Sequence, residues 1–309
     1  MISTNVIQVI VDFNLEQMEK KKLVISFSGG ETSGFMAQWL LINKKDEYDI
    51  ICIFANTGQE NEETLEFIDK CDKAFDMNLV WIEAIVHKEH GVGVTHKIVN
   101  FDTASRNGDP YENAIAKYGI PNIRKPHCTQ YLKTIPMKSY FRSIGWKKYY
   151  TAIGIRVDEI DRVNKDRIKN RLLYPLVTDI PTTKQKINFW WKNQPFRLEL
   201  KGYQGNCKWC FKKSLNKLLT LCVESPEHFD FPKRMEQKYQ NFTPEGGTPN
   251  GNQWRFFRDN RSVDELMELS KLPFTKSIND ATVYSWQTSL LDVDHLDLSN
   301  GCEESCEIY

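Results

Sequence analysis

The sequence predicts an α/β protein with an open, mostly parallel sheet and helices on both faces, followed by a smaller, mainly helical C-terminal region that contains cysteines. Two observations lead to this class. In the first half, short apolar runs alternate with amphipathic segments, which is the pattern of parallel strands joined by helices. From Pro181 onward the sequence becomes aromatic, basic and mostly helical. We expect one domain over residues 1–200 and a second region over residues 201–309, with a soft boundary near Leu200.

Four apolar runs are expected to form strands, and three amphipathic segments are expected to form helices. The strands are expected at Leu23–Phe27, Ile50–Ala55, Leu79–Ile85 and Tyr149–Ile155, and the helices at Gly34–Leu41, Glu60–Asp76 and Tyr131–Ile144. In the second helix the residues expected to face the core are Leu65, Phe67, Ile68 and Ala74. In the third, Pro136 must lie early or kink the helix. Between Val86 and Pro126 we expect a long, mobile substrate loop, because its three histidines complete no tetrahedral metal site.

Composition and charge exclude several classes of protein. Hydrophobic residues make up 40% of the 309, enough for a globular core. No apolar run approaches the ~18–20 residues of a membrane span, and no signal peptide is seen. Lys and Arg number 41, as do Asp and Glu, so overall charge predicts no polyanionic partner. Eight cysteines in a leaderless chain favour a reducing compartment. We expect a cytoplasmic protein without membrane contact.

The segment Ser28–Ser33 lies between the first strand and the first helix. Its glycines let the backbone approach a ligand closely, and the free amides of a first helical turn attract phosphate. Hydroxyl groups of Ser28, Thr32 and Ser33 add donors at the same place. The alternative is an ordinary turn with Ser and Thr as helix caps. Neither the Gly-Lys-Ser/Thr spacing of a Walker loop nor G-x-G-x-x-G is present.

Two further polar segments follow predicted strands, and ligands of open parallel sheets bind beyond the carboxyl ends of their strands. These segments are Asn56–Gln59 and Gly154–Arg162. Arg156 and Arg162 carry fixed positive charges suited to gripping phosphate or sulfate. Asp158 or Glu159 could bind Mg²⁺ or orient Arg156. The alternative is a surface pattern of ion pairs.

The stretch from Lys184 to Lys217 contains nine basic residues and one acid, Glu199, interleaved with aromatic residues. This combination suits phosphates and unstacked bases, so a nucleic-acid acceptor could bind here. The alternative is a solvated basic face over buried aromatic side chains. The interleaved aromatic residues are Phe189, Trp190, Trp191, Phe196, Tyr203, Trp209 and Phe211.

Cys207 and Cys210 form a C-x2-C pair, which is a metal or redox signature. Cys128 lies 79 positions before Cys207. A closed zinc site made by Cys207 and Cys210 with Cys302 and Cys306 is one arrangement that the sequence allows.

The loop and the ordered motifs after it resemble the phosphoadenosine-phosphosulfate (PAPS) reductase family of the PP-loop superfamily. The resemblance covers about residues 23–220 and implies a Rossmann-like, PP-loop (HUP-type) fold that binds an adenine nucleotide. The matching stretches are Ser28–Ser33, Phe54–Glu60 with Glu63–Leu65, Cys128–Pro136, Gly154–Glu159 with Arg162, and Tyr174–Leu176. The nucleotide-binding residues that it implies are Ser26, Ser28, Gly29, Gly30, Thr32, Ser33, Ala55, Asn56, Thr57, Gly154 and Arg156. Many members carry Lys-Asp at Glu31-Thr32, so this chain lacks a loop cation.

The resemblance also implies roles for cysteines. In one branch, Cys-Cys and a later C-x2-C hold a 4Fe–4S cluster, and Cys128, Cys207 and Cys210 correspond to three of those ligands, with zinc or no metal as alternatives. The fourth ligand could be His127, Cys222, a tail cysteine or an exogenous sulfur. The tail around Cys306 faintly resembles the nucleophile-bearing end of the reductases. The residues expected to be catalytic are Arg156, Arg162, Asp158, Glu159 and Cys306.

Three functions are consistent with this resemblance. The first is an ATP pyrophosphatase that uses ATP with Mg²⁺ to adenylate an acceptor before sulfur replaces AMP. The second is a sulfonucleotide reductase that releases sulfite from PAPS or APS. The third is a nucleotide-binding protein with little catalysis. The partners implied are an adenine nucleotide and a thiol reductant or sulfur-donor protein, and the oligomeric state, a homo-oligomer included, is open.

Overall fold

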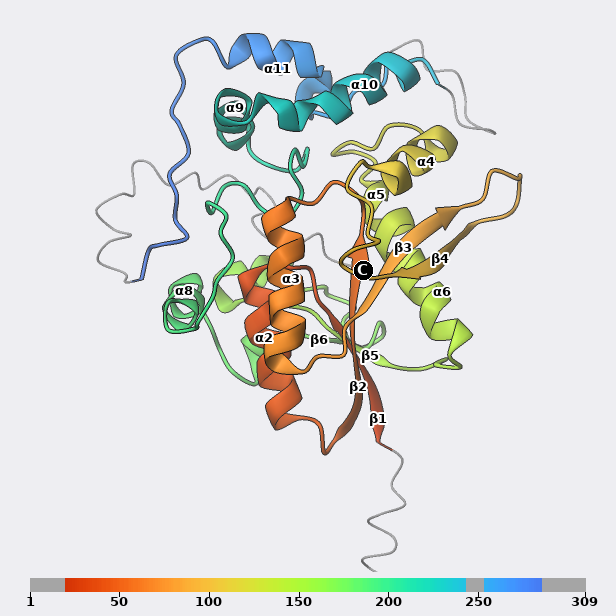
Figure 1. Cartoon of the computed structure of the whole chain (residues 1–309), viewed down its shortest axis with the longest axis vertical. Coiled ribbons are helices and arrows are strands. Elements are labelled where there is room, and N and C mark those ends of the chain that lie inside the picture. Colours follow the sequence, from red (N-terminus) through yellow and green to blue (C-terminus); the bar gives the residue numbers. More distant parts are fainter. Residues whose placement is uncertain (1–19, 243–252, 285–309) are drawn as a thin grey trace, which may run out of the picture.

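The computed structural model describes residues 20–242 and 253–284. At its centre is a six-stranded sheet with the order β4-β3-β2-β1-β5-β6 (Figure 1). Four of the five neighbouring pairs run parallel, and β4 is antiparallel to β3. The strands are β1 Lys21–Ser26, β2 Tyr48–Asn56, β3 Val80–Val86, β4 Val94–Val99, β5 Tyr150–Ala152 and β6 Leu172–Leu173. The predicted fold class is therefore confirmed.

The order of the strands reverses at β1, because the chain moves from β1 towards β3 on one side and returns to β5 on the other. Such a switch point opens a crevice at the carboxyl ends of the two central strands. The predicted Ser28–Ser33 loop follows β1 directly, so it lies at this crevice.

Helices cover both faces of the sheet. Leu23, Ile25 and Phe54 face α2, α3 and α8 on one side, and Val24, Ile53 and Ile82 face α6 on the other. Because helices cover both faces of the sheet, the side chains on both faces of the central strands are apolar, and the sequences of these strands are largely apolar. The helices of this part are α2 Glu31–Asn43, α3 Glu62–Phe75, α4 Asp109–Tyr118, α5 His127–Thr129, a π-helical turn Gln130–Thr134, α6 Ile135–Ser143, α7 Pro175–Thr178 and α8 Lys184–Lys192.

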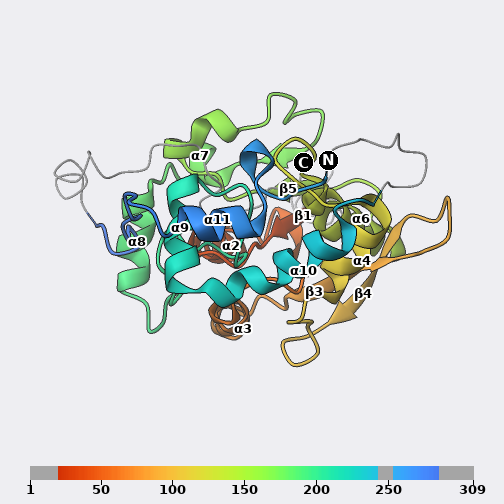
Figure 2. The ribbon, with the colours of Figure 1, turned by 90° about the horizontal axis from the view of Figure 1, so that it is seen from above.

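Three further helices lie above the carboxyl ends of the parallel strands, as the two views show (Figures 1 and 2). Their apolar side chains share one core with α4 and with residues on the α6 side of the sheet, such as Ile115 and Leu132. The segment after Leu200 is thus packed into the first part of the chain. The helices are α9 Leu215–Glu224, α10 Asp230–Tyr239 and α11 Val263–Leu269, with 3-10 turns at Val157–Arg162, Pro226–Phe229 and Arg258–Asn260.

Two local expectations were wrong. The segment from Val86 to Pro126 is not one long loop, because it contains β4 and α4. In β4, at the edge of the sheet, Val94 alone is fully buried, and α4 is short, so neither gives a long apolar signal. In α3 the buried partner of Leu65, Phe67 and Ile68 is Cys71, whereas Ala74 is exposed. Pro136 lies in the first turn of α6, as expected.

No helix in the described part of the chain is long and apolar enough to cross a membrane.

Candidate functional site

The loop after β1 is held in a conformation that requires glycine. Gly29 has a φ of +85°, and a Cβ there would lie 2.7 Å from Ile68 Cδ1 and 2.8 Å from Thr64 Cγ2. Gly30 is the N-cap of α2 and has no side chain with which to cap the helix, and the first turn of α2 begins directly after it. The Ser28 and Ser33 hydroxyls are 3.0 Å apart, and Ser33 Oγ donates to Gly30 O at 2.9 Å. The loop therefore presents amides and hydroxyls to an anion.

Glu31 departs from the usual loop sequence, and the structure compensates for its charge. Its carboxylate accepts two hydrogen bonds from Arg197, from Nε at 3.0 Å and from Nη2 at 3.1 Å. The Trp191 indole donates to the Glu31 carbonyl at 2.8 Å. Glu31 is 4% exposed, so this bidentate pair is largely withdrawn from water. The acid is therefore directed away from the ligand side of the loop and neutralised by a residue 166 positions later.

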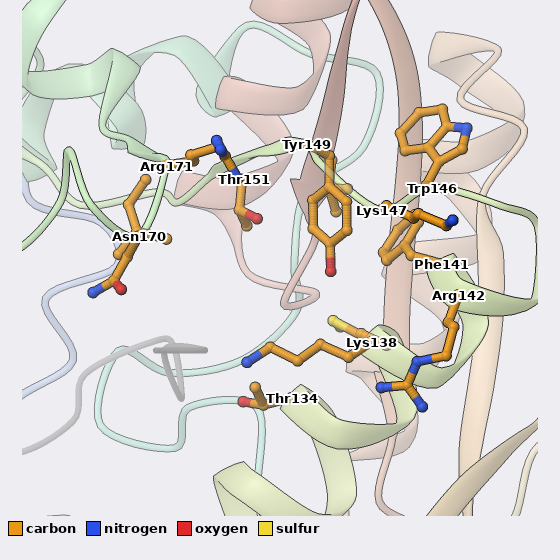
Figure 3. A pocket seen from close by; sticks show the side chains of 13 residues that line it. Thr134, Lys138, Phe141, Arg142, Trp146, Lys147, Tyr149, Thr151, Asn170 and Arg171 are labelled. Carbon is orange, nitrogen blue, oxygen red and sulfur yellow. The ribbon is translucent and has the colours of Figure 1, made fainter.

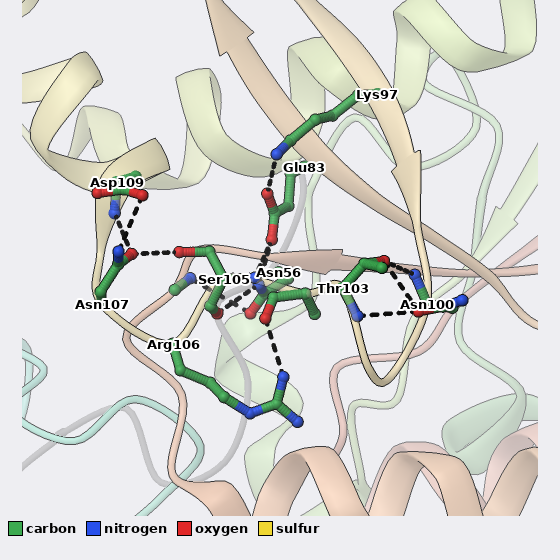
Figure 4. A network of polar contacts seen from close by, with 11 residues as sticks. Asn56, Glu83, Lys97, Asn100, Thr103, Ser105, Arg106, Asn107 and Asp109 are labelled. Carbon is green, nitrogen blue, oxygen red and sulfur yellow. Dashed lines mark hydrogen bonds and ion pairs between the residues drawn. The ribbon is translucent and has the colours of Figure 1, made fainter.

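The end of β2 is fixed by two buried acids. The Asn56 amide donates to Glu83 Oε1 at 2.6 Å and to Ser105 O at 2.9 Å, and Glu83 pairs with Lys97 at 2.8 Å (Figure 4). Glu60 accepts from the backbone N–H of Thr57 at 3.0 Å and from its hydroxyl at 2.8 Å. Asn56 and Thr57 are thereby held at the crevice by a framework that sequence reasoning did not identify.

The end of β5 brings an arginine against the loop. Arg156 is 2% exposed, and its Nη1 donates to Thr32 Oγ1 at 3.0 Å. Its Nε donates to Asp158 Oδ1 at 3.1 Å, and Arg162 pairs with Glu159. The ion pairs of the alternative interpretation are thus present, but Arg156 is buried at the loop rather than on the surface. Asp158 and Glu159 both contact Arg156, and whether they orient it or bind Mg²⁺ stays a prediction.

Gly154, just after β5, lies beside the first turn of α2, since a Cβ there would lie 3.4 Å from Ser33 Cα, an ordinary contact distance. Ser26 ends β1, and Ala55 is buried beside Ile53 under α6. The predicted nucleotide-binding residues therefore belong to the ends of three adjacent strands, β1, β2 and β5.

The C-x2-C turn docks on this same site. The Asn206 amide donates to the Ser28 carbonyl at 2.8 Å, and the backbone of Asn206 accepts from Asn61 N at 3.0 Å. Lys208 N donates to Gln59 O at 3.0 Å, and the Trp209 indole donates to Gln59 Oε1 at 2.6 Å. A segment about 180 residues after the loop is thus part of its wall.

All three predicted metal cysteines lie around one phenol. Burial raises the pKa of Tyr111 well above its usual range, and the neighbouring thiols of Cys128, Cys207 and Cys210 raise it further. Cys128 also hydrogen-bonds to the Tyr111 hydroxyl. Tyr111 packs on Trp209 with ring centroids 5.3 Å apart. Tyr111 is therefore a common electrostatic neighbour of the three cysteines, and their role as metal ligands stays a prediction.

Although these three cysteines share Tyr111 as a neighbour, the described side chains do not form a metal centre. Within residues 20–242 and 253–284, no three His, Cys, Asp or Glu side chains are arranged as a group that could hold a metal ion. Burial lowers the pKa of His127 to about 4, so its ring is neutral at pH 7. Burial raises the pKa of Cys222 to about 12, and this thiol lies in the apolar core of α9. Cys302 and Cys306 lie outside the described residues.

The basic and aromatic stretch is mostly an interior segment. Trp191, Tyr203, Trp209 and Phe211 are buried, whereas Phe189 is 57% exposed. The basic side chains of Lys184, Lys213 and Lys217 are also buried. Few of its aromatic rings could therefore stack on bases.

Sequence reasoning missed Arg197, Asn206 and Gln59 as parts of the site. Arg197 carried a weak signal, since a loop with Glu in place of Lys needs a compensating cation. Asn206 directly precedes the C-x2-C pair, where a turn residue is expected. Gln59 was within the predicted crevice but without an assigned role.

The open sheet, the glycine loop at its switch point and the buried arginine define the PP-loop class of nucleotide-binding proteins. The profile of the family described as phosphoadenosine phosphosulfate reductase domain matches residues 22–171. This chain belongs to that PAPS reductase-like family.

Three relatives of this chain are described as uncharacterized proteins. An uncharacterized nin region protein of Escherichia phage lambda is 33% identical over 206 residues, which are 65% of this chain and 69% of that protein. Two uncharacterized proteins of Methanocaldococcus jannaschii are 28% and 22% identical over 46% and 54% of this chain. The matches span only 32% and 30% of those archaeal proteins.

Among solved structures, PAPS reductase from Candida auris, crystallised as a phosphate complex, is similar at a TM-score of 0.28 and 16% identity. The likeness covers 48% of this chain and 60% of that one, and it carries no argument about the site.

Proposed function

We propose that this protein is an ATP pyrophosphatase that adenylates an acceptor and then allows sulfur to replace AMP. The observation that supports it most is the convergence of three segments at one crevice. The buried Arg156 contacts Thr32 in the first turn of α2, and Asn206, which precedes the C-x2-C pair, contacts Ser28 of the loop. The proposal therefore assigns phosphate-binding groups and the C-x2-C thiols to one site.

Binding and activation of the nucleotide would fall to the backbone and one arginine. The first-turn amides and the hydroxyls of Ser28 and Ser33 would hold the phosphates, and Arg156 would stabilise charge on the α-phosphate and on departing pyrophosphate. Asn56 and Thr57 would border the adenosine. Because Arg156 is already held by Thr32 and Asp158, little reorganisation is needed when substrate binds.

The reaction would proceed in two displacements. An oxygen of the acceptor attacks the α-phosphorus, pyrophosphate leaves with Mg²⁺, and the acceptor carries AMP. The terminal sulfur of a donor persulfide then attacks the acceptor atom that bears the adenylated oxygen, and AMP leaves with that oxygen. A second thiol attacks the resulting disulfide, which releases the sulfurated acceptor and leaves the two donor sulfurs as a disulfide. A cysteine beside Tyr111 would take up this sulfur from the donor persulfide, which leaves as a thiol, and no step here depends on a bound metal.

The test is pyrophosphate release from ATP and Mg²⁺ by protein purified without oxygen, with metal content measured on the same sample. We expect release that Ser33→Ala reduces by about tenfold or more, since a buried phosphate donor is lost. Ser143→Ala is the control, because Ser143 is an exposed hydroxyl at the end of α6. Absence of pyrophosphate from the wild-type protein would contradict the proposal.

A sulfonucleotide reductase is the second candidate, and the description of the matched family favours it. The same crevice would then hold a sulfonucleotide, and a thiol would take its sulfite. Thioredoxin-dependent sulfite release from PAPS or APS, without pyrophosphate release from ATP, would select this function. Tight nucleotide binding without either product would select a binding protein.

A further inference from the structure

A second, separate pocket lies on the α6 face of the sheet. Its volume is about 450 Å³, within the usual range for small-molecule sites. It is bordered by α6, by the middle of β1 and β5, and by the turn into β6 (Figure 3). Val24, Met137 and Leu172 form its apolar floor. None of the predicted nucleotide-binding residues lines it, so it is not part of the crevice described above.

Four cationic side chains line this pocket: Lys138, Arg142, Lys147 and Arg171. None of the lining residues is acidic. Among the ion pairs between described residues, none involves these four side chains. Like charges that share a cleft repel one another and concentrate positive potential there. An anion would relieve that repulsion.

The pocket also offers aromatic surface. Phe141 stacks on Trp146 with ring centroids 5.6 Å apart and 24° between the rings, and Tyr149 packs on Phe141 at 4.8 Å. Figure 3 shows the Tyr149 hydroxyl pointing towards the side chain of Lys138. Trp146 and Tyr149 are only half-buried, so parts of their rings face the solvent. Aromatic faces beside cations suit a nucleobase joined to phosphate.

The pocket also contains hydroxyl and amide groups that could form hydrogen bonds with a nucleotide. The Thr134 and Thr151 hydroxyls and the Asn170 amide line the side of the pocket opposite Trp146 (Figure 3). Thr134 ends the π-helical turn that follows Cys128, and Arg171 ends the connection that begins at Gly154. Both segments that border the pocket therefore also reach the crevice.

We propose that this pocket binds a phosphorylated nucleotide unit, with its phosphate on the four cations and its base against Trp146 and Tyr149. The unit belongs either to a single strand of nucleic acid or to a free mononucleotide. The proposal does not depend on the reaction at the loop, because none of the residues that carry it lies in the crevice.

The test measures binding of a fluorescein-labelled dT12 strand and an rU12 strand to the whole protein, with Mg·ATP present to fill the loop site. Lys138→Gln/Arg142→Gln removes two pocket charges. Lys70→Gln/Lys271→Gln is the matched control, because both lysines are exposed and lie on α3 and just after α11. Unlabelled thymidine monophosphate serves as the competitor, since it tests a free nucleotide without being an adenine nucleotide.

We expect the pocket variant to weaken binding about tenfold at 50 mM salt, while the control matches wild type. The slope of log K against log salt should fall in magnitude by about 1.4, because each phosphate contact to a single strand contributes about 0.7. Trp146→Leu should weaken binding by about fivefold, corresponding to loss of one stacked base.

Competition by thymidine monophosphate at similar affinity would assign the pocket to free nucleotides. Strand binding that the mononucleotide barely competes with would assign it to single strands, and both results support the proposal. Equal binding by wild type, pocket variant and control would overturn it, as would failure of both ligands to bind. Neither outcome bears on pyrophosphate release, so the two proposals fail separately.

Discussion

The two basic regions of this protein differ in how their charges are balanced. At the crevice, Arg156 is paired with Asp158, Arg162 with Glu159 and Arg197 with Glu31. In the pocket on the α6 face, four cations converge without an acidic side chain among the lining residues. The first region carries its own counter-ions, and the second does not.

We take this difference to distinguish charges that are held in position before a ligand arrives from charges that attract a ligand. A buried arginine without a partner would cost several kcal/mol, so the acids at the crevice keep Arg156 in place before any ligand arrives. Exposed cations need no such support, and water solvates them until an anion binds. We infer that the crevice is organised for chemistry and that the pocket is organised for attraction.

The largest effect is expected from Gly29→Ala, which removes the geometry on which the crevice depends. A Cβ would meet both Ile68 and Thr64 at a positive φ, so overpacking adds to backbone strain. We expect a loss of about 3 kcal/mol in unfolding free energy and loss of ATP binding. Urea denaturation and calorimetry measure these quantities.

Gly91→Ala is the control for backbone strain alone. Gly91 has a similar φ of +77°, and no atom lies within 4 Å of a Cβ built there. It should cost only about 1 kcal/mol and leave ATP binding intact. Equal effects of the two substitutions would contradict the close packing of the loop.

Arg156→Lys tests whether charge alone is enough at the crevice. Lysine keeps the charge but cannot bond to Thr32 and Asp158 with the fork of a guanidinium. We expect pyrophosphate release to fall by about 100-fold, corresponding to roughly 2.7 kcal/mol of transition-state stabilisation. Arg261→Lys is the control, since Arg261 pairs with Asp259 at 2.9 Å in the turn before α11. A drop of the same size in both variants would point to folding rather than chemistry.

Glu236 extends the comparison to a buried acid that is held by backbone amides. It accepts from Phe256 N at 3.2 Å and Val263 N at 2.9 Å, and burial raises its pKa to about 7. The unfolded chain releases this proton near pH 4.5, whereas the folded protein holds it to about pH 7. Stability should therefore fall by about 3 kcal/mol as pH rises from 4.5 to 7 and then level off.

The measurement is urea denaturation at intervals across that pH range, for wild type and for Glu236→Gln. The amide does not titrate, so this part of the slope should vanish in the variant. An unchanged slope would assign the pH dependence to other groups.

Exchanging the charges of Glu31 and Arg197 should give the smallest effect. Glu31→Arg and Arg197→Glu each place like charges together, and each should lower the unfolding free energy. The double variant restores opposite charges, so a double-mutant cycle should show a coupling energy of about 1 kcal/mol. Thermal denaturation at low and high salt measures it, and additive single effects would mean that the pair contributes nothing.

The sequence predicted much of the sheet and of the crevice, for a physical reason. Strands such as β2 are buried on both faces, and the loop at Ser28–Ser33 has a local glycine requirement, so both leave strong local patterns. Sequence reasoning was weaker where contacts are long-range. β4 and α4 were missed because an edge strand and a short helix have weak periodicity.

The same distinction applies within the site. The compensation of Glu31 by Arg197 and the docking of Asn206 on Ser28 join residues more than 160 positions apart. No local pattern encodes such pairs. The basic and aromatic stretch had the composition of a nucleic-acid surface, yet the core of the fold uses most of its aromatic rings. The pocket cations were overlooked because they come from α6, the turn that follows it and the start of β6.

The most direct test of the central claim is isothermal titration of Mg·ATP into three proteins: wild type, Arg156→Lys and the pocket variant Lys138→Gln/Arg142→Gln. We predict one ATP per chain for wild type, unchanged binding for the pocket variant and at least tenfold weaker binding for Arg156→Lys. Weakened ATP binding in the pocket variant with normal binding in Arg156→Lys would contradict the assignment of the nucleotide to the loop.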